Sequence, residues 1–154
     1  MSAEMKNMSN RLIAIFENIM KIEHESILQE YGDKISIAEI HTIAAIGSGE
    51  LCSMSEVAGK LHITVGTLTV AISNLVRKGY VERYKSEKDR RLVKLGLTKQ
   101  GKEVFQIHNE FHERMAQYLT RDMTEEEKKV VKKALMNLEQ FIEQGYRELE
   151  IIQG

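Results

Sequence analysis

The chain has 154 residues, of which 42% are hydrophobic and 29% are charged, a composition typical of one globular domain. It contains no apolar run long enough to cross a bilayer, which excludes an integral membrane protein, and its first residues lack the apolar core of a secretory signal. We therefore expect a cytoplasmic protein without membrane contact. The single cysteine, Cys52, excludes an internal disulfide and any multi-cysteine zinc site.

The net charge of −1 conceals a strongly basic middle segment. Residues 53–102 carry a net charge of +7, whereas residues 1–52 and residues 103–154 each carry −4. A concentrated positive field attracts polyanions, of which nucleic acid is the commonest. The alternative is an ordinary solvated surface of mixed charge.

Apolar spacing and capping residues predict six helices. Apolar residues three and four positions apart predict a long helix over residues 4–31, and the absence of proline permits such lengths. Three capping-box patterns, each a serine or threonine followed three residues later by glutamate, predict further helix starts, and two more threonines are expected to cap the remaining helices. The expected caps are Ser36, Ser53, Thr64, Thr98 and Thr124.

A β-hairpin is predicted after the fourth helix. Gly79 is placed to end that helix in a left-handed conformation. The β-prone runs 80–85 and 92–97 are separated by the polar sequence SEKDRR, a pattern that predicts a hairpin. A short helix, a tight turn, a second helix and a hairpin form a winged helix-turn-helix. The predicted fold class is mainly α with a small β-hairpin wing.

The helix that Thr64 caps has an outer face suited to DNA. Exposed helix faces usually carry Glu and Lys, whereas this face carries small and polar residues that are poorer helix formers, which argues against a merely solvated surface. Small side chains allow close approach in the major groove, and Thr and Val can contact thymine methyl groups. The inner face is expected to bury Val65, Leu68, Ile72, Leu75 and Val76. The candidate DNA-binding residues are Thr64, Gly66, Thr67, Thr69, Val70, Ser73, Asn74 and Arg77.

The tip of the predicted hairpin is basic. Lys85, Lys88, Arg90 and Arg91 fall within seven residues, and a wing tip with arginine suits the negative potential of the minor groove. Asp89 is expected to orient one arginine through a fork-like pair. The alternative is a solubilising loop.

Three motifs in this region resemble the MarR family of winged-helix transcription regulators: 78–83 (KGYVER), 89–91 (DRR) and 97–101 (LTKQG). The resemblance implies a homodimer in which residues 1–34 and 98–154 form a helical dimerisation region and residues 35–97 form the DNA-binding lobe, together one intertwined domain. It implies no enzymatic activity. The expected partner is double-stranded DNA with a pseudo-palindromic operator.

Within that family, the segments 40–47 and 64–67 look most like the FabT subgroup, which represses fatty-acid synthesis genes in Gram-positive bacteria. The resemblance implies no required cofactor and, as corepressor, a long-chain acyl group carried on acyl carrier protein. An acyl chain needs an apolar slot, which adaptable methionine suits. Candidate lining residues, between the first and fifth helices, are Leu12, Phe16, Met20 and Phe105.

Four polar side chains fall on otherwise apolar stripes: Glu23, His41, His108 and His112. Burial of such groups costs free energy unless they bind one another or an ion. His108 and His112 are four residues apart on one predicted helix, a spacing that lets two imidazoles share a metal. The alternatives are a zinc site, as in zinc-sensing members of the family, and a hydrogen-bonded network. A metal-dependent enzyme is a remote alternative, because the sequence has no phosphate-binding loop or nucleophile elbow.

Overall fold

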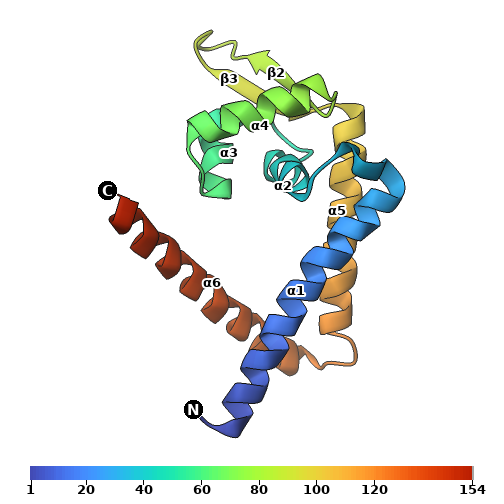
Figure 1. Ribbon diagram of the computed structural model, residues 1–154, viewed down its shortest axis with the longest axis vertical. Coiled ribbons are helices and arrows are strands. Elements are labelled where there is room, and N and C mark those ends of the chain that lie inside the picture. The colour runs from blue at the N-terminus through green and yellow to red at the C-terminus, as the bar shows by residue number, and fades with distance from the viewer. Residues whose placement is uncertain (154) are drawn as a thin grey trace. The chain divides into compact units, whose positions relative to one another are not determined.

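The computed structural model describes residues 1–153, with the side chains of residues 1–32 and 34–150. The fold is mainly helical with a small antiparallel sheet (Figure 1). The elements are α1 (Ala3–Tyr31), the 3₁₀ helix η1 (Gly32–Lys34), α2 (Ile37–Ile46), β1 (Cys52–Ser53), α3 (Met54–Leu61), α4 (Val65–Arg77), β2 (Val81–Lys85), β3 (Val93–Leu97), α5 (Lys99–Leu119) and α6 (Glu125–Gln153).

The chain divides into two compact units, residues 1–111 and residues 112–154, and α5 runs from the first into the second. Among the described residues, no helix is both long enough and apolar enough to cross a membrane.

The core of the first unit lies where α2, α3 and α4 gather beside the hairpin (Figure 1). The sheet has the strand order β1-β3-β2, and both pairings are antiparallel. Leu68, Ile72 and Leu75 from α4 are fully buried in the same hydrophobic core as Ile40 of α2 and Leu95 of β3. The predicted hairpin and three of the five predicted inner residues of α4 are therefore confirmed.

The predicted helix starts are confirmed by their hydrogen bonds. The Ser36 and Ser53 capping boxes are complete in both directions. Thr64 accepts a hydrogen bond from the backbone N–H of Thr67, and Thr98 accepts one from that of Gly101. Thr124 and Glu127 likewise exchange hydrogen bonds before α6.

The structure differs from the sequence prediction in the first turn of α4 and in the sheet. Val65 is 44% exposed rather than buried, because it lies in the first turn of α4, before the helix reaches the core. The sheet also has a third strand, β1, in which Cys52 pairs with Leu95. Gly79 has φ of 85° and ends α4 in the left-handed region, as expected.

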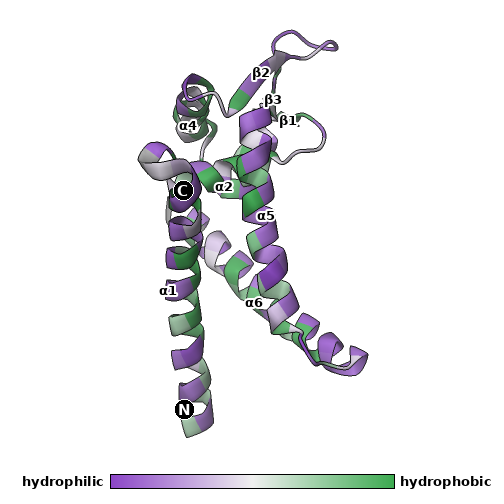
Figure 2. Ribbon diagram, turned by 90° about the vertical axis from the view of Figure 1, so that its right-hand side faces the viewer, coloured by the Kyte–Doolittle hydropathy of each residue, from purple (hydrophilic) through white to green (hydrophobic). Residues whose placement is uncertain are grey.

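The long helices expose most of their apolar side chains. Along α1 only Glu23 and Ile27 are buried, and no described side chain of α6 is buried. Hydrophobic and hydrophilic positions alternate along both helices (Figure 2). The exposed large hydrophobic residues of α6 are Val130, Leu135, Met136, Leu138, Phe141, Ile142, Tyr146 and Leu149.

Candidate functional site

The outer face of α4 is exposed except at Asn74, which is half-buried. Val70 is 65% exposed, and Gly66, Thr67, Thr69 and Ser73 are also exposed. On one side this face borders a groove of about 500 Å³ between α2 and α4. The groove is lined by Ser36, Ala38, Glu39, Thr42, Thr67, Val70, Ala71 and Asn74. The surface that the sequence assigns to DNA is thus accessible, and the groove between α2 and α4 lies beside it.

Several hydroxyl groups on α4 form hydrogen bonds within the protein. The Thr69 hydroxyl donates to the carbonyl oxygen of Val65 at 2.8 Å, and the Ser73 hydroxyl donates to that of Thr69 at 2.9 Å. The Thr64 hydroxyl donates to Oγ1 of Thr67 at 3.0 Å. Such bonds fix the side-chain rotamers, so the face is ordered before DNA arrives.

The C-terminal end of α4 is held by an ion pair to α2. Nζ of Lys78 lies 2.8 Å and 2.9 Å from the two carboxylate oxygens of Glu39. Burial raises the pKa of Glu39, but hydrogen bonds from Lys78 and Ser36 outweigh it and hold this pKa below its ordinary value of 4.5. The pair connects α4, which we call the recognition helix, to the capping box of α2.

The wing presents its predicted basic residues to solvent: Lys85, Lys88, Arg90 and Arg91 are all exposed. Asp89 was predicted to orient an arginine side chain through a fork-like pair, but it bonds to the backbone of the wing tip instead. Its carboxylate accepts a hydrogen bond from the backbone N–H of Arg91 at 3.0 Å. The reason is local, because an Asp side chain is short enough to bond the chain two residues ahead.

Arg83 on β2 is a further candidate that is not among the predicted site residues. Its Nη2 donates a hydrogen bond to the Ser73 hydroxyl at 2.8 Å, which joins the hairpin to α4. The two residues lie ten positions apart in different elements, and no local pattern signals their contact.

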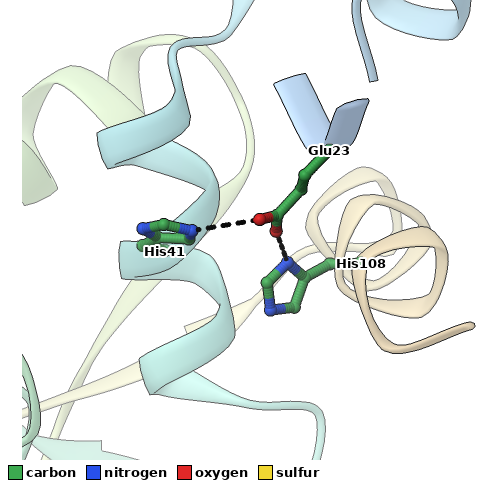
Figure 3. A group of neighbouring side chains, drawn as sticks. All are labelled: Glu23, His41 and His108. Carbon is green, nitrogen blue, oxygen red and sulfur yellow. Dashed lines mark ion pairs between the residues drawn. The ribbon is translucent and has the colours of Figure 1, made fainter. Parts of the chain in front are cut away.

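Glu23 stands at the centre of the second predicted site (Figure 3). It comes from α1 and is 1% exposed. Nε2 of His41 from α2 lies 3.6 Å from its Oε2, and the buried Nδ1 of His108 from α5 lies 2.5 Å from its Oε1. Three elements therefore meet at one buried carboxylate.

This Glu23 cluster, defined as Glu23, His41 and His108, has the dimensions of a metal site. One ligand atom from each residue lies within 4.8 Å of the others. The two imidazole rings meet edge to face with centroids 5.8 Å apart. His112 is half-buried one turn further along α5 and is not among these three. The structure thus brings together three of the four predicted ligands.

The predicted acyl-slot residues lie in different surroundings. Phe105 on α5 packs against the core of the first unit. On α1, Leu12 is half-buried, while Phe16 and Met20 are 58% and 43% exposed. The acyl slot stays a prediction.

Comparison with known proteins identifies the family. The MarR family sequence model matches residues 35–93. The HTH-type transcriptional regulator BilQ of Clostridium symbiosum is 33% identical over 116 residues, which are 75% of this chain and 78% of that protein. A crystal structure of Streptococcus pneumoniae FabT in complex with DNA is 41% identical, covers 90% of this chain and 97% of its own, and has a TM-score of 0.81.

A more distant structure supports the fold. The MarR protein of Peptoclostridium difficile is 22% identical, covers 93% of this chain and 92% of its own, and has a TM-score of 0.70. The accessible α4 face, the basic wing and these similarities agree with the sequence motifs. The chain belongs to the MarR family of winged-helix proteins, and it is a DNA-binding transcriptional regulator rather than an enzyme.

Proposed function

We propose that this regulator is a FabT-like repressor of fatty-acid synthesis genes, acting in the cytoplasm on a pseudo-palindromic operator. The observation that carries the proposal is the similarity to Streptococcus pneumoniae FabT, which extends over 90% of this chain at 41% identity. That FabT structure contains DNA. The direct contacts would come from the outer face of α4 in the major groove and from Arg90 and Arg91 in the minor groove.

The proposed active form is a homodimer built from residues 1–34 and 98–154. Its support is the apolar surface along α1 and α6, of which Phe16 is 58% and Phe141 75% exposed in one chain. Surfaces of this kind mark interfaces. We propose that a second copy of the same chain covers this apolar surface, because a two-fold symmetric operator is read by a two-fold symmetric dimer. Phe141→Glu should give monomers in light scattering and abolish binding to the full operator.

The proposed corepressor is a long-chain acyl group on acyl carrier protein. The acyl chain would enter an apolar slot lined by Leu12, Phe16, Met20 and Phe105. The acidic carrier protein would dock on the basic segment 53–102. A ligand tightens DNA binding only if it binds the DNA-competent form more tightly than the other form. In gel-shift titrations, long-chain acyl carrier protein should tighten operator binding, and the unacylated carrier should not. Equal affinity with both carriers would contradict the proposal.

A second candidate function, a zinc-responsive repressor, is favoured by the Glu23 cluster. Two imidazole nitrogens and a carboxylate oxygen are a donor set that zinc accepts, and atoms within 4.8 Å of one another need only a small adjustment to surround one ion. In that case Glu23, His41, His108 and His112 would hold zinc and connect α1, α2 and α5. Metal would then bias the position of the DNA-binding lobe.

One pair of variants separates the two candidates. His108→Ala combined with His112→Ala should abolish any zinc response while leaving an acyl response largely intact. His24→Ala, also on a helix of the first unit but outside the Glu23 cluster, is the matched control. Zinc that tightens operator binding in the wild type but not in the double variant, with no effect of acyl carrier protein, would establish the second function instead.

A further inference from the structure

Arg83 links the wing to the recognition helix. It is exposed on β2, and its Nη2 donates to Oγ of Ser73 on α4 at 2.8 Å. The same hydroxyl donates to the carbonyl oxygen of Thr69 at 2.9 Å. The Ser73 hydroxyl therefore gives its hydrogen to the helix and accepts from the guanidinium, which fixes both side chains.

The geometry of duplex DNA places a sugar-phosphate strand beside the contact between Arg83 and Ser73. The major groove and the neighbouring minor groove are separated by one sugar-phosphate strand. When α4 occupies the major groove and the wing tip the adjacent minor groove, that strand must pass between the helix and the hairpin. The contact between Arg83 and Ser73 joins these two elements.

We propose that Arg83 binds a phosphate of this strand and that Ser73 is its positioning residue. A guanidinium carries five N–H donors in a planar fork, and one of them is used by Ser73. Among the described residues, no acidic side chain forms an ion pair with Arg83, whereas Lys78 at the end of α4 is paired with Glu39. The neighbouring Glu82 accepts a hydrogen bond from the hydroxyl of Tyr84. Arg83 thus keeps its charge and most of its donors for DNA.

The role of Arg83 is tested by the salt dependence of DNA affinity. Arg83→Gln should weaken binding about tenfold or more, as expected for a lost charged hydrogen bond. In the proposed homodimer both copies lose the contact, so the slope of log affinity against log salt should become less steep by about 1.8, about 0.9 for each phosphate contact. The loss should be equal on operator and unrelated duplex, since a phosphate carries no sequence information. Arg121→Gln, in the turn between α5 and α6, removes the same charge elsewhere and should leave the slope unchanged.

The role of Ser73 is tested by variants that keep the arginine. Ser73→Ala should weaken binding with the salt slope of the wild type, and Ser73→Thr should restore affinity. Ser73→Ala should have no further effect in the Arg83→Gln background, because it acts through Arg83. Arg83→Lys should keep the slope but lose affinity. A wild-type slope for Arg83→Gln would overturn the phosphate contact. A change of sequence preference in Ser73→Ala would overturn the positioning role and make Ser73 a base contact.

Discussion

Gly101 allows α5 to begin against the backbone that follows the recognition helix. A Cβ at this position would lie 2.1 Å from the carbonyl oxygen of Tyr80 and 3.3 Å from Cβ of Leu97. To relieve this clash, the backbone at Tyr80 or at residue 101 would have to move by about 1 Å. The same Tyr80 oxygen accepts a hydrogen bond from the Thr98 N–H at 3.1 Å, and Thr98 caps α5, so the movement would disturb the cap.

We therefore expect Gly101→Ala to destabilise the fold despite the better helix propensity of alanine. Overpacking costs about 1–3 kcal/mol and a weakened hydrogen bond about 1 kcal/mol, against a gain of at most about 1 kcal/mol from propensity. The net loss of about 2 kcal/mol corresponds to a fall in Tm of roughly 4–8 °C for a chain of this size.

The assay is chemical and thermal unfolding at one fixed protein concentration, with Gly96→Ala as the matched control. A Cβ on Gly96 would meet Cδ2 of Leu51 at 2.7 Å and Cε2 of Tyr84 at 3.1 Å. Both are ends of exposed side chains that can rotate away, so the control should lose less than about 1 kcal/mol. A Gly101→Ala variant as stable as wild type, or less affected than the control, would refute the reasoning.

Three further predictions concern the wing, the outer face of α4 and the ion pair between Lys78 and Glu39. Arg90→Ala and Arg91→Ala should each weaken DNA binding without lowering Tm, since the tip is exposed; a fall in Tm would show a structural role instead. Asn74→Ala should change sequence preference by about 1–3 kcal/mol, the value of a lost base contact, in competition between operator variants; an unchanged preference would contradict the base contact. The depressed pKa of Glu39 means that its contribution to stability is present above pH 4.5 and is lost as the pH falls through the lowered value. In acid titrations of the free energy of unfolding, Lys78→Met should reduce this loss, and an unchanged profile would contradict the assignment.

Features encoded by neighbouring residues were predictable from the sequence. The capping boxes and the left-handed Gly79 depend on a few adjacent positions, and each is present as expected. The Glu23 cluster was also foreseeable, because a carboxylate and two histidines on apolar stripes must find one another or an ion. Its members His41 and His108 do so.

Features that depend on tertiary packing were not predictable. Strand β1 has two residues, too few for any alternating pattern, and exists because Cys52 lies beside Leu95 of β3. Helical spacing alone places Val65 on the inner face of α4, but the core does not extend to the first turn. The apolar stripe of α1 gives no indication of whether the same chain or a second copy covers it.

The hydroxyl of Thr69 has a chemical consequence for recognition. Its hydrogen is committed to the carbonyl oxygen of Val65, so toward DNA the side chain offers lone pairs and a methyl group. In the major groove lone pairs can meet only the amino groups of adenine or cytosine, while a methyl group fits beside that of thymine. Guanine O6 and N7 and the phosphate oxygens all require a donor, and Thr69 has none left for them. We therefore expect Thr69 to disfavour guanine at any base that it faces, because its hydroxyl hydrogen is bonded within α4.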